Sequence, residues 1–282
     1  MRTAVYTCGM RDSRASYLKA MGIVEWRLRE QVDATESPTT LAPAASHAIE
    51  HTPDDATAKS PEPAGPASYE SIPGGAAAPA TGAARDSGDD LTDEEIARID
   101  WETLQRAVAA CTRCELHRTR TQTVFGVGNR QAEWMFVGEA PGFEEDRRGE
   151  PFVGRAGKLL DAMLAAVGMA REDVFIANVL KCRPPNNRDP QGGEVRQCGA
   201  YLLRQIDLVK PRLLIALGRF AAQALLNTTR PIGKLRGEVF KHAASGIPLV
   251  VTYHPAYLLR NPLDKRKAWQ DLCLIKRVSE ST

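Results

Sequence analysis

The sequence of 282 residues has no apolar run approaching the roughly 20 residues that a membrane-spanning helix needs. Its first ten residues also lack the apolar core of a secretory signal peptide. We therefore predict a cytoplasmic protein with no membrane partner. In a reducing compartment, the six cysteines are expected to serve as thiols or metal ligands rather than as disulfides.

Aliphatic residues are scarce between Asp33 and Asp90, where Ala, Pro, Ser, Thr and Gly dominate and Tyr69 is the one aromatic residue. Such a segment cannot bury enough apolar surface to offset the entropy lost on ordering. Its ten acidic and two basic residues make it strongly negative. The composition predicts a disordered acidic linker over 33–90, which separates an N-terminal segment (1–32) from a domain at 91–282.

The N-terminal segment has apolar residues over 14–32 that are spaced loosely like one face of a helix. Such a helix would either dock a protein partner or pack on the main domain, and both alternatives stay open. The domain from Leu91 onward carries 29 basic and 22 acidic residues. This balance is compatible with a polyanionic partner and equally with an ordinary soluble surface.

Short apolar runs alternate with helix-like segments from Trp134 onward. The apolar runs are WMFVG (134–138), DVFIANVL (173–180), RLLIALG (212–218) and PLVVTY (248–253). The helix-like segments are AGKLLDAMLAAVG (156–168), GGEVRQCGAYLLRQIDLV (192–209), RFAAQALLN (219–227) and DKRKAWQDLCLIKRV (264–278). Continuous apolar strands between amphipathic helices are typical of parallel strands covered on both faces. We predict an α/β fold, a three-layer αβα sandwich around a central four-stranded, mostly parallel sheet.

Two weaker signals lie outside this alternation. Thr92 and Glu95 form a capping-box pattern, which predicts a helix running toward Cys111. Residues 233–240 carry a weak hairpin signal.

Unusual residues stand at or near the end of each of the four apolar runs. They are GEAPG (138–142), Asn178, Gly218 with Arg219, and His254 with Pro255. In open parallel sheets, ligands bind at the carboxyl ends of the strands. We therefore expect a ligand site at this edge of the sheet.

Four cysteines have spacings that suggest a metal centre. Cys111 and Cys114 form a C-x2-C pair, whereas fifteen residues separate Cys182 from Cys198. Four thiolates can hold zinc or an iron-sulfur cluster, and structural zinc usually takes two close pairs. The wide second pair therefore favours a [4Fe-4S] cluster, with ordinary buried thiols at Cys182 and Cys198 as the alternative.

Six motifs occur in a defined order along the chain. They are CTRCELHRTRTQTVFGVG, FVGEAPGFEEDRRGEPFVGRAGKLLD, IANVLKCRPPNNRDP, PRLLIALGRFAAQALL, PIGKLRG and VVTYHPAYLLR. Together they resemble the family 4 (iron-sulfur) uracil-DNA glycosylases, over about Cys111 to Lys276. The resemblance implies a monofunctional, monomeric enzyme of base excision repair. It would flip uracil out of single- or double-stranded DNA and hydrolyse its N-glycosidic bond, leaving an abasic site.

The resemblance also implies site residues. The ligands of a structural [4Fe-4S] cluster, held in a loop region, would be Cys111, Cys114, Cys182 and Cys198. The uracil pocket would contain Gly138, Ala140, Pro141, Gly142, Phe152 as the stacking platform and Asn178 as the reader of the base edge. The catalytic residues would be Glu139 and His254. The most familiar members carry an aspartate where this chain has Ala140, so Glu139 either orients water or fixes uracil and its loop, and the second role is favoured.

Elementary chemistry agrees with these pocket residues. The amide of Asn178 offers one donor and one acceptor, which can meet O4 and N3–H of uracil, whereas cytosine inverts both groups. Cleavage leaves negative charge on the uracil oxygens, and a donor such as His254 aimed at O2 would stabilise that charge.

DNA contacts are expected from two stretches. KCRPPNNR would contact phosphates through Lys181, Arg183 and Arg188. After His254, Leu258 or Leu259 would fill the vacated base stack as an apolar wedge and Arg260 would bind a phosphate. Packing of both leucines under the following helix is the equally supported alternative.

Two other functions remain open. One is a superfamily member that binds uracil-DNA and traps it covalently. Members of that branch carry an additional basic, histidine-containing loop after the second strand, whereas KCRPPNNR has no histidine. The other is a non-catalytic iron-sulfur or zinc scaffold whose N-terminal helix at 14–32 recruits a partner.

Overall fold

The structure, a computed structural model, describes residues 90–281. The predicted helix at 14–32 and all but the last residue of the predicted linker lie outside the described residues. The helices are α2 (Asp93–Ile96), α3 (Trp101–Ala110), α4 (Phe143–Arg148), α5 (Arg155–Ala166), α6 (Gly192–Val209), α7 (Arg219–Leu226), α8 (Pro255–Arg260) and α9 (Lys265–Ser281). The strands are β1 (Val127–Gly128), β2 (Trp134–Gly138), β3 (Phe175–Asn178), β4 (Leu213–Leu217), β5 (Val239–Lys241) and β6 (Pro248–Thr252).

The described strands form one six-stranded sheet in the order β1-β3-β2-β4-β6-β5. The four central strands are parallel and coincide with the four apolar runs of the sequence. The predicted count of four strands is wrong, because β1 and β5 add antiparallel edge strands. These edges are two and three residues long and partly exposed, so they leave no apolar run in the sequence. The weak hairpin signal at 233–240 overlaps β5, which pairs with β6.

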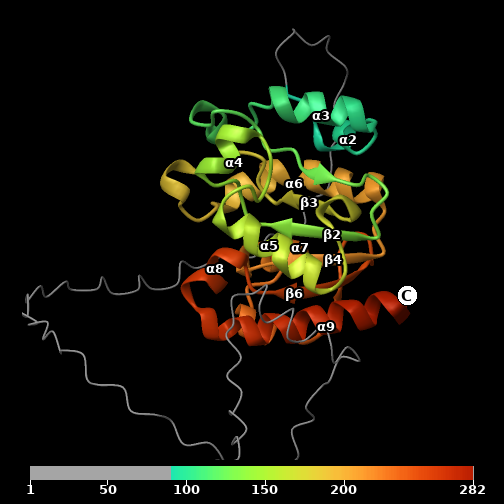
Figure 1. Cartoon of the computed structure of the whole chain (residues 1–282). Helices are drawn as coiled ribbons and strands as arrows, with labels where there is room; N and C mark the ends of the chain where they lie inside the picture. Colours follow the sequence, from blue (N-terminus) through green and yellow to red (C-terminus); the bar gives the residue numbers. More distant parts are fainter. Residues whose placement is uncertain (1–89, 282) are drawn as a thin grey trace, which may run out of the picture. The chain divides into compact units, whose positions relative to one another are not determined.

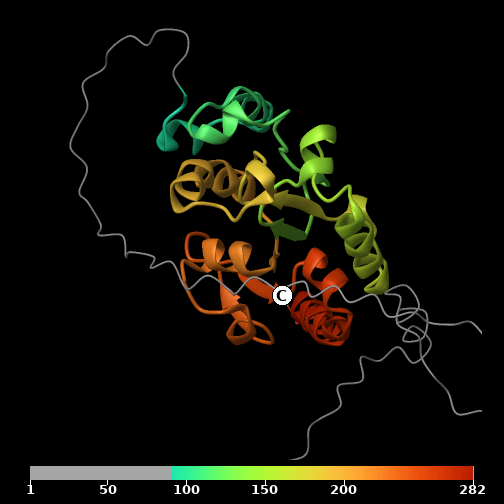
Figure 2. The same ribbon diagram turned by 90° about the vertical axis from the view of Figure 1, so that its left-hand side faces the viewer.

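Helices cover both faces of the sheet, as Figures 1 and 2 show. One buried cluster joins residues of α2, α3, α6 and α7 to one face, and a second joins α5, α8 and α9 to the other. The predicted αβα layering is therefore present. Among the described residues, no helix combines the length and the apolar character needed to cross a membrane.

The segment before the sheet differs from its prediction. Thr92 and Glu95 do form a capping box, in which Oγ1 of Thr92 accepts from the Glu95 N–H and the Glu95 carboxylate accepts from the Thr92 N–H. The helix that they open ends at Ile96, however, and α3 begins anew after Asp100. The Asp100 carboxylate accepts from the N–H of Thr103 at 2.8 Å, which caps α3.

The carboxyl ends of the four parallel strands meet at one edge of the sheet. Strand β2 ends opposite β3, with Gly138 paired to Asn178 in register. Strand β6 is followed by His254, which caps α8, and Pro255 occupies the first position of that helix. Helices α4 and α8 both lie at this edge, on the left of Figure 1. The predicted site residues are thereby brought to one place.

Candidate active site

Gly138, Phe152, Asn178 and His254 lie together at this edge. A Cβ atom on Gly138 would lie 2.3 Å from Oδ1 of Asn178 and 2.7 Å from Cζ of Phe152, so glycine is required there. The ring centroids of Phe152 and His254 are 5.4 Å apart with an interplanar angle of 31°. Four residues predicted from three separate motifs therefore line a common space.

Phe152 has a strained backbone that its neighbours hold in place. Its φ of 54° lies in the left-handed region, which an aromatic residue rarely adopts. Its main-chain oxygen packs so closely on Gly157 that a Cβ there would lie 1.7 Å away. Such strain persists only where the surroundings fix the conformation, and it gathers at functional sites.

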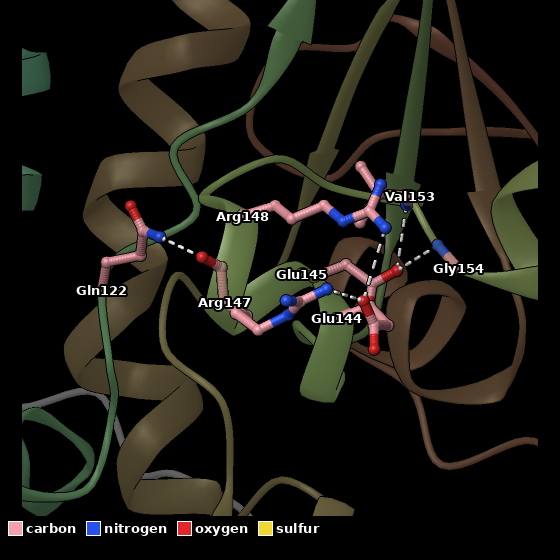
Figure 3. Close-up of polar contacts among 7 residues, drawn as sticks. All are labelled: Gln122, Glu144, Glu145, Arg147, Arg148, Val153 and Gly154. Atoms are coloured by element: carbon pink, nitrogen blue, oxygen red, sulfur yellow. Dashed lines mark hydrogen bonds and ion pairs between the residues drawn. The ribbon is translucent and has the colours of Figure 1, made fainter.

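Glu145 is the main support of this loop, and it was not among the predicted site residues. Its Oε1 accepts hydrogen bonds from the main-chain N–H groups of Val153 (3.0 Å) and Gly154 (3.1 Å). Figure 3 shows these bonds reaching from α4 to the loop just after Phe152. In the sequence, Glu145 sits in an acidic helix start that resembles any solvated turn, so only the folded geometry reveals its function.

Helix α4 is itself tied to a neighbouring segment and stabilised by ion pairs within it, as Figure 3 also shows. Nε2 of Gln122 donates to the main-chain oxygen of Arg147 at 2.7 Å. Glu144 forms ion pairs with Arg147 (2.9 Å) and Arg148 (3.5 Å). These contacts steady the helix from which Glu145 reaches the loop.

Asn178 carries a buried acceptor without a partner. The residue is 2% exposed, and its Oδ1 accepts no hydrogen bond within the described chain. Leaving a buried polar atom unpaired costs about 1 to 3 kcal/mol, so such an atom needs an explanation. A ligand that donates a hydrogen bond to Oδ1 would remove this cost.

His254 is held as a neutral donor. Its Nδ1 accepts from the main-chain N–H of Ala256 at 3.1 Å, which leaves the proton of the neutral ring on Nε2. Burial, together with a smaller effect of the nearby Arg260 charge, lowers the pKa of His254 to about 4. Gly218, at φ 93°, makes room for this ring, because a Cβ there would lie 2.9 Å from Cβ of His254.

Glu139 carries a half-buried carboxyl. Burial first, and then the charge of Asp189, raise its pKa to about 7 against the opposing charge of Arg219. Asp189 and Arg219 form an ion pair of 3.1 Å. Within the described chain, the Glu139 carboxylate makes no hydrogen bond or ion pair. It is therefore able to take a proton near neutral pH.

The backbone around Glu139 is fixed by the neighbouring strand. Its main-chain oxygen accepts from the N–H of Leu180, and that of Gly138 accepts from the N–H of Val179, both at 3.0 Å. The next residue, Ala140, is half-buried and Pro141 is buried. The loop 138–142 therefore keeps a set position beside Asn178.

The basic loop after β3 does not present all its predicted DNA contacts. Lys181 is 1% exposed, so its assignment to phosphate is wrong. Arg188 is bound to the buried carboxylate of Glu194, with one hydrogen bond of 3.0 Å, and this pairing fixes the loop. Arg183 stays near the surface, and its guanidinium lies 5.2 Å from the ring centroid of Phe143, which is 58% exposed.

Helix α8 also revises the predicted wedge. Leu258 is 0% exposed and packs in the core, so it is not a wedge. Leu259 is half-buried against the same cluster, and Arg260 is exposed. The exposed leucine of this region is Leu263, 92% exposed on the turn Pro262–Asp264 that follows.

The four predicted cysteine ligands line a single pocket. The pocket is lined by Val108, Cys111, Arg113, Cys114, Arg120, Lys181, Cys182, Gln197, Cys198 and Tyr201. Nη1 of Arg120 donates to Sγ of Cys182 at 3.1 Å, and the Lys181 N–H donates to Sγ of Cys198 at 3.2 Å. Burial raises the pKa of the Cys198 thiol to about 12. Among the described residues, no three side chains are arranged closely enough to hold a metal ion.

A buried donor in this pocket has no partner. Nη1 of Arg113 donates no hydrogen bond within the described chain, so it offers an unpaired N–H. The same side chain forms an ion pair with Asp93 and lies over the ring of Tyr201. The pocket thus combines four thiols with N–H groups that point at their sulfurs and one N–H group without a partner. Such surroundings suit an anionic group that is bound by thiolates.

The chain is similar in sequence to known proteins of one superfamily. The family model for the uracil DNA glycosylase superfamily matches residues 125–273. The chain is 50% identical over 169 residues to the type-4 uracil-DNA glycosylase of Archaeoglobus fulgidus, covering 57% of this chain and 84% of that protein. It is 47% identical over 171 residues to that of Thermotoga maritima, covering 60% and 86%. It is 42% identical over 182 residues to that of Pyrobaculum aerophilum, covering 62% and 93%.

Proposed function

The chain belongs to the uracil DNA glycosylase superfamily, and we propose that it excises uracil from DNA as a type-4 enzyme. It would hydrolyse the N-glycosidic bond and leave an abasic site for base excision repair. The observation that carries this proposal is the buried, unpaired Oδ1 of Asn178 beside the rings of Phe152 and His254. That arrangement suits a flat base whose edge donates a hydrogen bond to Oδ1 of Asn178.

Recognition of uracil follows from Asn178 and Phe152. The unpaired Oδ1 accepts the N3–H of uracil, and the amide N–H donates to O4. Cytosine has no hydrogen at N3 and presents an amino group in place of O4, so it would leave both amide groups mismatched. The Phe152 ring offers the flipped base a stacking surface, which is worth about 1 to 3 kcal/mol in single-strand binders.

His254 stabilises the departing base. Its Nε2–H donates to O2 of uracil, where negative charge gathers as the bond breaks. Because the ring is neutral over the physiological range, it donates a hydrogen bond without protonating the base. Removing one such preorganised donor typically costs about 10²- to 10³-fold in rate.

Glu139 holds the attacking water. A role in fixing its loop would require the Glu139 carboxylate to accept hydrogen bonds there, and within the described chain it accepts none. Glu145 instead accepts two such bonds, from the loop after Phe152. A carboxyl with a pKa of about 7 is well matched to accept a proton from water at neutral pH. This assignment reverses the role that the sequence favoured.

The cysteine pocket would hold a [4Fe-4S] cluster through Cys111, Cys114, Cys182 and Cys198. The group would supply a structural crosslink between the segment before the sheet and the loop after β3. Arg113 and Arg120 would donate toward its sulfurs. Iron and sulfide analysis of the purified protein tests this assignment, and zinc without sulfide would overturn it.

DNA would lie along the edge between α4 and α8. Arg183 and Arg260 are the phosphate contacts that remain after the corrections above. The exposed ring of Phe143 offers a neighbouring base a stacking surface. Leu263 provides the apolar contact with duplex DNA in place of Leu258.

The deciding experiment uses oligonucleotides with a single dU, dT, dI or dC. Alkali-labile cleavage at dU, with release of free uracil and no slowly migrating crosslinked band, is expected. Absence of cleavage by a preparation with a full iron content would overturn the proposal. A crosslinked band instead of free product would identify the covalently trapping alternative.

A further inference from the structure

Lys181 is buried at the site, although the sequence predicts it at the surface. Only 1% of the residue is exposed. Its Nζ donates to the main-chain oxygen of Asn178 at 2.8 Å and to Oε1 of Gln205 at 2.6 Å. Burying an ammonium group is costly even with partners, and an apolar residue would fill the space without that cost. The amine therefore needs a specific function.

The main chain of Lys181 is fixed as firmly as its side chain. Its N–H donates to Sγ of Cys198 at 3.2 Å, and its carbonyl accepts from the N–H of Val124 at 2.8 Å. Gln205, the second acceptor of the amine, donates in turn to the main-chain oxygen of Phe125 at 2.9 Å. Lys181 thus joins the end of β3 to α6 and to the segment 124–125, and its Nζ has a set position.

The amine of Lys181 holds Asn178 by its main chain rather than by its side chain. Its Oδ1 makes no hydrogen bond within the described chain, so no such bond orients that end of the amide. The bond from Lys181 fixes the carbonyl of the same residue, three positions earlier in the chain. Because the Asn178 side chain is short, the direction of its amide follows the orientation of its backbone.

We infer that Lys181 is a positioning residue, which aims the Asn178 amide at the edge of the base. The inference rests on the proposed function, in which Asn178 reads uracil. Lys181 itself does not touch the base and acts through the Asn178 backbone. A misplacement of about 1 Å at such a site can cost about 10²-fold in rate, so a single lost anchor is measurable.

A double-mutant cycle tests this inference. The variants are Lys181→Met, Asn178→Ala and the double variant, with kcat and KM measured on single-stranded dU DNA and inhibition measured with free uracil. Lys181→Met is expected to lower kcat/KM about ten-fold and to weaken inhibition by free uracil, because a hydrogen bond from a charged group is lost. In the Asn178→Ala background, the same change should cost less than about two-fold, because the group it positions is gone.

Controls separate positioning from folding. Lys265→Met removes another buried lysine on α9 and should change neither kcat/KM nor inhibition by uracil. Iron content and melting temperature are measured for every variant, and Lys181→Gln repeats the cycle if Lys181→Met does not fold. Equal losses in both backgrounds would overturn the inference. If the unaltered protein fails to excise uracil, the proposed function fails instead, and the two failures are therefore distinguishable.

Discussion

Replacing Glu139 by Gln should make the protein more stable at high pH, and the gain should disappear at low pH. The pKa of Glu139 is about 7 in the folded protein, against an ordinary value of 4.5. The unfolded chain therefore loses this proton first, and stability falls as the pH rises from about 4.5 through about 7. Glutamine has no such proton, so the variant escapes this loss.

The size of the effect follows from the two pKa values. Linkage over a shift from 4.5 to about 7 predicts that the stability difference between variant and parent grows by about 2.5 kcal/mol from pH 5 to pH 8. Water reaches part of the half-buried carboxyl, which reduces the expected gain to about 2 kcal/mol. Urea unfolding of both proteins at several pH values measures this difference, because other groups titrate alike in the two.

Excision rates test the function of the same carboxyl. If Glu139 accepts a proton from the attacking water, the single-turnover rate of the parent protein should rise with pH through about 7. Glu139→Gln should be slower by about 10²-fold or more and should lack this rise. The matched control is Glu102→Gln, at an exposed position of α3, where a hydrogen bond from Arg130 lowers the pKa and excision should keep the parental pH profile. If the stabilities of parent and Glu139→Gln change in parallel from pH 5 to pH 8, the raised pKa of Glu139 is refuted. If Glu139→Gln keeps the pH dependence of the parental excision rate, the proton transfer from water to Glu139 is refuted.

Three further changes have distinct expected results. His254→Ala should slow excision by about 10²- to 10³-fold, and because the pKa of His254 is about 4, the parent should show no loss of rate from this group between pH 6 and 8. Glu145→Ala releases the loop that carries Phe152 and should weaken inhibition by free uracil, while Glu145→Gln, which keeps one acceptor oxygen, should weaken it less. Leu263→Ala should slow excision about five- to ten-fold from duplex DNA but not from single-stranded DNA. The control Leu203→Ala, at an exposed leucine on α6, should change neither rate. Equal losses on both substrates would contradict a contact between Leu263 and duplex DNA.

Much of the fold could be predicted because buried parallel strands leave continuous apolar runs in the sequence. Edge strand β1 escaped prediction and β5 gave only a weak hairpin signal, since two or three partly exposed residues carry no periodicity. The helix opened by Thr92 was predicted correctly at its start and wrongly at its end. Asp100 offers the carboxylate that begins a second helix, and a local pattern alone does not show which of two caps prevails.

Some features of the candidate site could also be predicted from the sequence, and others could not. Asn178 and His254 could be found because strand ends in a parallel sheet converge, and the neighbouring motifs supply the glycines that admit them. The burial of Lys181 could not be found, because a lysine in a basic loop has the same local signature whether it meets a phosphate or a buried carbonyl. Its partner Gln205 lies 24 residues away in sequence, and only the packing of α6 against β3 brings the two together.

Two glutamates six residues apart illustrate how environment, rather than residue type, divides the chemistry of this site. Glu145 accepts two main-chain N–H groups, and these bonds commit its carboxylate to holding the loop of Phe152. Glu139 accepts no hydrogen bond within the described chain and is half-buried, so its negative charge is poorly compensated. A carboxylate that is already bonded is a weak base toward water, whereas an uncompensated one takes up a proton readily. The structural support of Glu145 thus leaves Glu139 free for proton transfer, and exchanging their environments would exchange their functions.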